Sequence, residues 1–192
     1  MSYDLPRPAG RLLLTPEDKE APARVRRLRL LGLGEHPEPA LDAFAAHLAG
    51  RAQAPYAMVN FIDQRRQFFA GLRVPDVRPL MSPDEEAKPE MGRLMERDHG
   101  FCPHVVVRRK ALVLEDVRDY PRFAGNPVVD EFGIRSYLGA PLIDTTGMVL
   151  GTVCIADTEP RPWGRSGLDT IKAAAAELVV RVERRKTDGF WL

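Results

Sequence analysis

Hydrophobic residues recur at helical spacing in two segments near the N-terminus. In residues 23–33 the apolar positions fall on one face, and two glycines then end the run, as C-terminal glycines commonly do. Residues 40–53 repeat the pattern and stop before Pro55, since the residue before a proline disfavours helical backbone. We therefore predict two amphipathic helices ahead of the first strand.

A third helix is predicted near the C-terminus, over residues 166–184, with Ser166 as its N-cap. Its apolar positions alternate between spacings of three and four residues, which is the pattern of a helix seam. The seam residues are Leu168, Ile171, Ala175, Leu178 and Val182. We expect the terminal helices to form a homodimer contact through this seam, although a helix face packed on a sheet would use the same residues.

Between these helices the apolar pattern changes to the alternation that is typical of β-strands. Residues 56–62 and 67–71 predict one hairpin, and residues 137–143 and 148–156 predict a second, with a shorter strand at residues 111–115. In the last strand of the second hairpin, strict alternation predicts one face of Val149, Gly151, Val153 and Ile155 and an opposite face of Leu150, Thr152 and Cys154. Both faces carry apolar residues, so we expect both sides of the sheet to be covered.

The remaining segments have weaker patterns. Residues 1–22 carry four prolines and little periodicity, and are expected to form an extended arm. Residues 72–100 carry four prolines and few apolar anchors, which predicts a long loop that is either a lid or disordered, with a short helix at the capping box that begins at Ser82. Further short helices are predicted at residues 101–107 and 127–132.

Composition and charge exclude several classes of protein. The 192 residues carry 28 basic and 27 acidic side chains, so the net charge of +1 provides no field that favours nucleic acid or an acidic membrane as a partner. No apolar run approaches the roughly 18 residues of a membrane span, and the N-terminus lacks the apolar core of a signal peptide. We therefore expect a cytoplasmic protein whose two cysteines are reduced.

Six sequence blocks, in order, resemble the GAF domain family over about residues 23–185, which leaves a tail of residues 186–192. The blocks are Val59-Asn60-Phe61-Ile62-Asp63 with Gln67-Phe68-Phe69, Gly100-Phe101-Cys102-Pro103-His104-Val105-Val106, Leu114-Glu115-Asp116, Pro121-Arg122-Phe123-Ala124-Gly125-Asn126-Pro127-Val128-Val129, Ile134-Arg135-Ser136-Tyr137-Leu138-Gly139-Ala140-Pro141-Leu142 and Leu150-Gly151-Thr152-Val153-Cys154-Ile155-Ala156-Asp157. They look like the subtype often found in front of histidine kinases and cyclic-di-nucleotide synthases, here without an output domain.

The resemblance implies an α+β, GAF/PAS-like fold. Its central antiparallel β-sheet would carry the terminal helices on one face and short helices and loops that roof a pocket on the other. Family members mostly bind small molecules or dimerise, which implies a non-enzymatic sensor or interaction domain for a small ligand or a signalling protein. The identity of any ligand or cofactor stays open.

Ten residues are predicted to line this pocket, as an apolar wall with a few polar anchors. They are Phe61, Phe69, Phe101, Cys102, His104, Asp116, Phe123, Arg135, Tyr137 and Cys154. In the alternative interpretation, the aromatic side chains fill the core and the pocket is collapsed.

Cys102 supports a second hypothesis, in which the protein is a thiol-based redox enzyme or sensor. A helix N-terminus and a nearby His104 would both favour the Cys102 thiolate, and Cys154 would be the resolving thiol. Some GAF proteins reduce free methionine sulfoxide, but they use a larger set of cysteines, so no catalytic residue is carried over here. The alternative, that Cys102 is a small buried core residue, is the commoner role of a free cysteine. The spacing from His99 to His104 matches no standard zinc motif, and no metal site is predicted.

Overall fold

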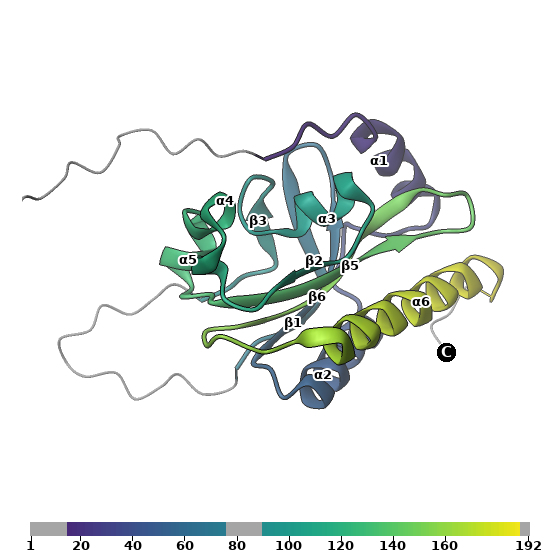
Figure 1. Ribbon diagram of the computed structural model, residues 1–192. Helices are drawn as coiled ribbons and strands as arrows, with labels where there is room; N and C mark the ends of the chain where they lie inside the picture. The colour runs from purple at the N-terminus through teal and green to yellow at the C-terminus, as the bar shows by residue number, and fades with distance from the viewer. Residues whose placement is uncertain (1–14, 76–89, 189–192) are drawn as a thin grey trace, which may run out of the picture.

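Six antiparallel strands form a single sheet in the part of the chain that the computed structural model describes, residues 15–75 and 90–188 (Figure 1). The strands are β1 (Tyr56–Ile62), β2 (Arg66–Arg73), β3 (Leu94–Glu96), β4 (Leu112–Leu114), β5 (Ser136–Ile143) and β6 (Val149–Asp157). Their order is β3-β2-β1-β6-β5-β4, so the two predicted hairpins meet at the centre of the sheet. The α+β class and the antiparallel sheet are confirmed.

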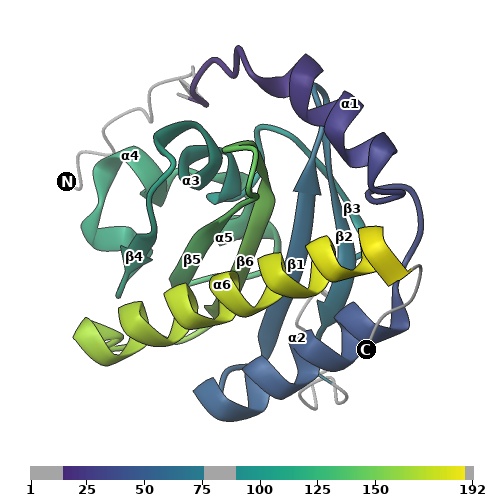
Figure 2. The ribbon, with the colours of Figure 1, turned by 90° about the vertical axis from the view of Figure 1, so that its right-hand side faces the viewer.

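Helices cover both faces of this sheet, as Figures 1 and 2 show. One face carries α2 (Pro39–Ala52) and α6 (Gly164–Asp188). The opposite face carries α3 (Cys102–Arg108), the 3-10 turn η1 (Val117–Asp119), α4 (Pro121–Ala124) and α5 (Pro127–Glu131). The helix α1 (Ala21–Leu30) passes across the ends of the central strands. None of the helices in the described residues combines the length and the apolar character that crossing a membrane requires.

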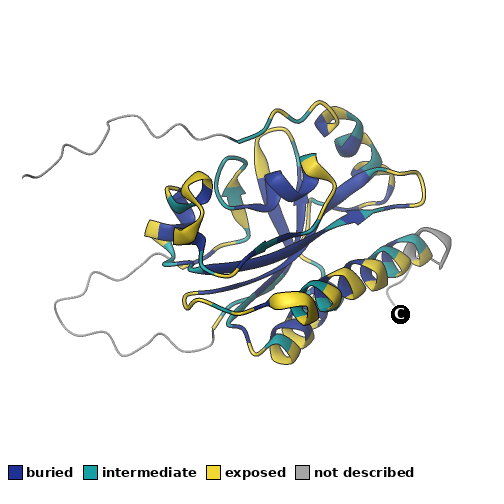
Figure 3. Ribbon diagram, in the orientation of Figure 1, coloured by how far each residue is buried: buried dark blue, intermediate teal, exposed yellow. Residues whose placement is uncertain are grey.

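The sheet therefore separates two hydrophobic cores, and the strands β1, β2, β5 and β6 are buried along most of their length (Figure 3). The core beneath α2 and α6 includes Val59 and Val153 from the central strands, packed with Leu178 of α6. The core beneath α3 includes Met58 and Cys154 from the same strands. Alternation along each strand thus supplies both cores at once, which explains why both faces of these strands are apolar.

A β-bulge corrects the face assignment at the start of β6. Leu142 pairs with Gly151 but Ile143 pairs with Val149, so Leu150 is the extra residue. As a result Val149 packs in the core beneath α3 and Leu150 in the core beneath α2 and α6, the reverse of strict alternation. The prediction is wrong for these two residues, because an inserted residue moves each preceding residue of the strand to the opposite face of the sheet.

The C-terminal helix also differs from its prediction. It begins at Gly164, so Ser166 lies within its first turn and is not the N-cap. Of the predicted seam, Ile171, Leu178 and Val182 are at most 2% exposed within their own chain. These residues serve the intrachain core, which is the alternative that the sequence left open.

Several elements were missed by the sequence pattern. They lie in the predicted long loop and in the cover, which is the name we give to α3, η1, α4 and α5 together. The predicted loop of residues 72–100 ends in strand β3, which pairs with β2 at the sheet edge. The short elements η1 and α4 were not predicted, because three or four residues are too few to show a period. The short helix expected at Ser82 lies outside the described residues.

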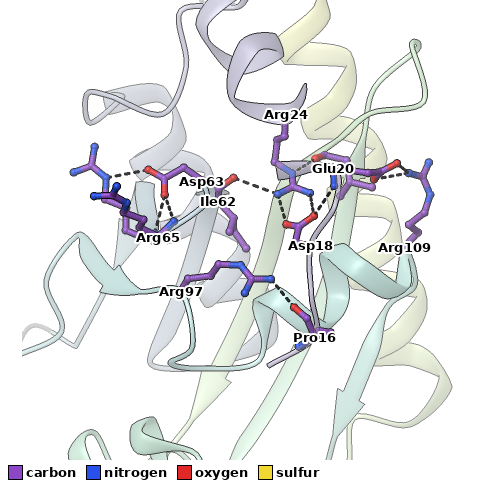
Figure 4. Close-up of polar contacts among 11 residues, drawn as sticks. Pro16, Asp18, Glu20, Arg24, Ile62, Asp63, Arg65, Arg97 and Arg109 are labelled. Atoms are coloured by element: carbon purple, nitrogen blue, oxygen red, sulfur yellow. Dashed lines mark hydrogen bonds and ion pairs between the residues drawn. The ribbon is translucent and has the colours of Figure 1, made fainter. Parts of the chain in front are cut away.

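The segment before α1 is tied to the sheet (Figure 4). The fully buried Arg24 donates hydrogen bonds to both carboxylate oxygens of Asp18, at 2.6 and 3.1 Å, and to the backbone oxygen of Val149, at 2.6 Å. Helix α1 begins at Ala21. Residues 15–20 of the expected arm lie outside any helix and are anchored here, whereas residues 21–22 belong to α1; residues 1–14 lie outside the described part of the chain.

Candidate functional site

Polar side chains from neighbouring strands line up on the sheet face beneath α3. Asn60 of β1 pairs in register with Thr152 of β6, and its Nδ2 donates to Oε1 of Gln67 on β2 at 2.8 Å. All three residues are at most 1% exposed. Fully buried polar residues are uncommon in a sheet core and need partners, so this row marks the candidate site.

Gln67 connects this row to the edge of the sheet. Its Nε2 donates to the backbone oxygens of Glu96, at 2.9 Å, and His99, at 2.6 Å. One side chain thereby ties β3 and the turn that follows it to the two central strands. The segment leading into α3 is held in place by a group of the site itself.

Two thiols and a phenol meet at the centre of the site. Cys102, the first residue of α3, has its Sγ 3.7 Å from Sγ of Cys154 on β6 and 3.3 Å from the hydroxyl oxygen of Tyr137 on β5. All three residues are buried. Gly139 pairs with Cys154, and a Cβ at Gly139 would lie only 2.2 Å from the Tyr137 hydroxyl, so the absence of a side chain there lets the phenol lie beside the thiols.

These contacts separate the acidities of the two thiols. Hydrogen bonding from Cys154, supported by Thr152, Tyr137 and Asn60, lowers the pKa of Cys102 to about 6 against the opposing effect of burial. The hydrogen bond to Cys102 and then burial raise the pKa of Cys154 well above its ordinary value. Burial is also the main cause that raises the pKa of Tyr137. Cys102 is thus the thiol that ionises first, and Cys154 and Tyr137 keep their protons.

His104 lies on the same helix but does not assist the thiol. Its ring packs edge-on against Phe123, with 4.9 Å between ring centroids, and its Nδ1 has no hydrogen-bond partner among the described residues. Burial, with the charges of Arg122, Arg108 and Arg97, lowers the pKa of His104 to about 4. The imidazole is therefore neutral at pH 7, and the expectation that it favours the Cys102 thiolate is wrong.

Asn126 holds the cover together above the thiols. Its Oδ1 accepts from the backbone N–H of Gly100 at 2.7 Å and of Val128 at 3.2 Å, while its Nδ2 donates to the carbonyl of Gly100 at 2.9 Å. The side chain thus caps α5 and also fixes the entry to α3. An Asn directly before a proline is a recognisable helix N-cap signal, but its second partner is not visible in the sequence.

A small cavity adjoins this site, between the sheet and the cover. Its volume is about 30 Å³, and Phe69, Phe101, Cys102 and Tyr137 contribute to its lining. That is close to the space of one water molecule, whereas small-molecule pockets usually measure about 300–1,000 Å³. In this conformation the aromatic side chains largely fill the predicted pocket, with Phe101 packed against Tyr137 at 5.1 Å between ring centroids.

Seven of the ten predicted residues come together on the face beneath α3. They are Phe69, Phe101, Cys102, His104, Phe123, Tyr137 and Cys154. Phe61 is wrongly assigned, because it lies in the opposite core beneath α2 and α6, while its neighbour Asn60 points into the site.

Asp116 and Arg135 are the other two predicted residues that lie outside this group. They form an ion pair with each other, with side chains 18% and 24% exposed, and Asp116 also caps η1 by accepting from the N–H of Arg118. Their role as polar anchors is therefore corrected to a structural one. Asn60 and Thr152 take their place; a polar residue inside an apolar strand was the signal that would have identified them.

Among the described residues, no group of three or more histidine, cysteine or acidic side chains is placed to hold a metal ion.

Comparisons with known proteins agree with this architecture. A family model of the GAF domain matches residues 36–182. A cyclic di-GMP phosphodiesterase of Pseudomonas aeruginosa is 30% identical over 178 residues, which are 91% of this chain but only 27% of the length of that protein.

Solved structures are similar at lower sequence identity. The free methionine-R-sulfoxide reductase of Neisseria meningitidis, solved with its substrate, has a TM-score of 0.60 at 14% identity, covering 90% of this chain and 96% of the other. A GAF domain from a phosphoenolpyruvate-protein phosphotransferase of Coxiella burnetii has a TM-score of 0.58 at 16% identity, covering 88% and 96%. At these identities the likeness concerns the fold alone.

Proposed function

The chain belongs to the GAF domain family, a sensor and regulatory fold, and from this premise we propose that it is a non-enzymatic sensor domain that takes up a small polar ligand on the sheet face beneath α3. The ligand would contact Asn60 and Thr152 on the sheet and Cys102 on the cover. Its binding would be reported to a signalling protein or to a second copy of the chain.

The observation that carries this proposal is the buried row of polar groups with an unsatisfied member. Oδ1 of Asn60 has no hydrogen-bond partner among the described residues, although the side chain is fully buried and its Nδ2 is already bound to Gln67. Leaving a buried acceptor unpaired costs about 1–3 kcal/mol. A ligand that brings a hydrogen-bond donor to Asn60 would recover that free energy, which favours a small polar molecule at this position.

Ligand uptake requires the cover to move, because the cavity of about 30 Å³ is too small for more than a water-sized molecule. The helices of the cover are short: α3, α4 and α5 have only 7, 4 and 5 residues. Helices this short depend on their packing and not on their own hydrogen bonds for stability. A shift of the cover is therefore also the event by which occupancy would be signalled.

The size and burial of the site favour binding over catalysis. A reductase of free methionine sulfoxide must admit an entire amino acid to its reactive thiol, and Cys102 and Cys154 are at most 4% exposed behind the small cavity. Turnover would require this cover to open and close in each cycle. A sensor needs only a slow exchange of ligand.

Homodimerisation remains part of the proposal, through a different surface from the predicted seam. The seam residues Ile171, Leu178 and Val182 pack in the intrachain core. The outer side of α6 is exposed (Figure 3), and Val180 there is 47% exposed. We place the contact between copies on this outer side, with Ala176 beside Val180 one helical turn earlier.

Native mass spectrometry of the freshly purified protein tests the ligand directly. A bound compound that is released on denaturation is expected, and adding the recovered compound back should raise Tm. Thr152→Val, which removes one buried hydroxyl at the site, should reduce this rise in Tm, while Thr170→Val on α6 should leave it unchanged. A protein that retains no compound, and whose Tm is unaffected by a panel of small polar metabolites that includes free methionine-R-sulfoxide and cyclic di-GMP, would contradict the proposal.

A further inference from the structure

The two cysteines of the chain lie in contact, although 51 residues separate them in the sequence. We propose that hydrogen peroxide converts Cys102 and Cys154 into an intramolecular disulfide that fixes α3 to β6. This inference is independent of the ligand proposed above, because it needs only the two thiols and a small oxidant.

The geometry already brings the sulfur atoms close to bonding distance. Their separation is 3.7 Å, and a disulfide bond of about 2.05 Å requires them to approach by less than about 2 Å. Cys102 is the first residue of α3, and Gly100 two residues before it adopts a left-handed φ of 74°. The adjustment would involve the first turn of this seven-residue helix together with Gly100 and the Asn126 side chain that is bonded to it.

The neighbours of the thiols assign their roles. Sγ of Cys102 lies within hydrogen-bond distance of the Cys154 thiol and the Tyr137 hydroxyl, which stabilise its thiolate, whereas Cys154 keeps its proton. The thiolate is the form that attacks peroxides, so Cys102 is the nucleophile. Cys154 is the only other thiol in the chain, and it lies in contact with the first. It is therefore the resolving thiol.

The chemistry balances in two steps. The Cys102 thiolate attacks one oxygen of the peroxide, the O–O bond breaks, and the other oxygen takes up a proton and leaves as water, so that Cys102 becomes a sulfenic acid. The sulfur of Cys154 then attacks the sulfenic sulfur, the S–O bond breaks, and the departing hydroxide takes the Cys154 proton to form a second water. Two thiols lose two electrons in total, and one peroxide is reduced to two waters.

The cavity selects the oxidant by size. It has a volume of about 30 Å³ and Cys102 forms part of its lining, so a molecule little larger than water can reach the sulfur. Glutathione disulfide and bulky alkyl hydroperoxides are too large for this space. With the cover closed, the site would therefore respond to hydrogen peroxide and not to glutathione disulfide.

Formation of the disulfide would change the cover as well as the thiols. Cys102 would no longer offer a thiolate to the Tyr137 hydroxyl, which lies 3.3 Å away, and α3 would be attached covalently to a central strand. The cover movement that ligand uptake requires would then be blocked. The disulfide would thus keep the cover closed over the sheet face beneath α3.

Thiol counting after peroxide treatment tests the inference on the wild-type protein. The native protein is treated with hydrogen peroxide, excess oxidant is removed, and the protein is denatured and labelled with a maleimide. We expect two labels before treatment and none after it, a mass decrease of two hydrogen atoms, and a peptide map that links Cys102 to Cys154. Dithiothreitol should restore both labels.

Two variants separate the roles of the cysteines. In Cys154→Ser the oxidation should stop at the sulfenic acid of Cys102, which dimedone traps. Cys102→Ser should not be oxidised by hydrogen peroxide and should not be labelled by dimedone. Two labels that persist after treatment of the wild-type protein, or a disulfide formed only between chains, would overturn the inference whether or not the variants fold. Native mass spectrometry of reduced protein still reports on the ligand, so failure of one proposal is distinguishable from failure of the other.

Discussion

The hydroxyl oxygen of Tyr137 lies 3.3 Å from Sγ of Cys102, and this contact joins the middle of the sheet to the first residue of the covering helix α3. The same phenol occupies the space above Gly139, where any larger residue would collide with it. A single side chain therefore couples the packing of the sheet to the chemistry of a thiol. Changes at Tyr137 and at Gly139 should consequently have different effects, one on reactivity and one on stability.

Tyr137→Phe is expected to reduce the reactivity of Cys102 more than it reduces stability. The ring still fills its space, but the thiolate loses one hydrogen bond, so the pKa of Cys102 should rise. The loss of one hydrogen bond corresponds to about 0.5–1.5 kcal/mol, which lowers the ratio of thiolate to thiol roughly twofold to thirteenfold at any given pH. The rate of reaction with hydrogen peroxide as a function of pH measures this shift. An unchanged profile would show that the hydroxyl does not act on the thiol.

Gly139→Ala is expected to destabilise the fold. The added Cβ would lie 2.2 Å from the Tyr137 hydroxyl, so the ring must move out of a packed core, at a cost of about 1–3 kcal/mol. Gly50→Ala is the matched control, because a Cβ at Gly50 meets nothing within 4 Å and alanine favours the helix. Urea unfolding of both variants provides the measurement. Equal stability of Gly139→Ala and wild type would contradict the placement of the phenol.

Much of the fold follows from the sequence because its strands and helices are long enough to show a period. The alternation in residues 56–62 and 137–143 predicts two strands of the sheet, and the structure has them as β1 and β5. Which face each residue occupies depends on bulges, and a single inserted residue at Leu150 reversed the assignment for the start of β6. Bulges carry no periodic signal, so this error could not be avoided from one sequence.

The site was less predictable, because its members are joined by packing and not by spacing. Cys102 and Cys154 were singled out by residue type and by the expected helix N-terminus at Cys102, but their contact depends on how α3 docks on β6. Phe61 was chosen as an aromatic residue, whereas its polar neighbour Asn60 is the one that faces the site. In an otherwise apolar strand the polar residue carries the information, since burying it requires a reason.

The stability of the protein should fall as the pH decreases from about 6.5 to about 4, in part because of His104. Burial and the surrounding arginines lower its folded-state pKa to about 4, below the ordinary value of 6.5. Between these values the unfolded chain binds a proton that the folded chain does not, so acid favours unfolding. His104→Gln should flatten this part of the curve, while His47→Gln, at an exposed position on α2, should not. Free energies of unfolding in urea at pH 7 and pH 5 test the difference.

Asp18→Asn should detach the segment that precedes α1 and destabilise the protein near neutral pH. Burial raises the pKa of Asp18, but the hydrogen bonds and charge of Arg24 outweigh it, so the net shift is downward. Breaking a buried ion pair costs about 3–5 kcal/mol, because Arg24 is left buried without its partner. The contribution is present above the ordinary pKa of 3.8 and is lost as the pH falls through the lower folded-state value. The wild type and the variant should therefore converge in strong acid, and a difference that persists there would argue against the ion pair.

Two substitutions on α6 separate its internal face from its outer face. Leu178 is fully buried between α6 and the sheet, so Leu178→Glu should unfold the domain and abolish the cooperative transition in circular dichroism. Val180 is 47% exposed, so Val180→Glu should retain the circular dichroism spectrum and Tm of the wild type. If copies of the chain associate through the outer side of α6, light scattering at tens of micromolar should report a dimer for the wild type and a monomer for Val180→Glu. A wild-type dimer that persists in Val180→Glu would place the contact elsewhere, and a folded, monomeric Leu178→Glu would show that the seam lies between chains after all.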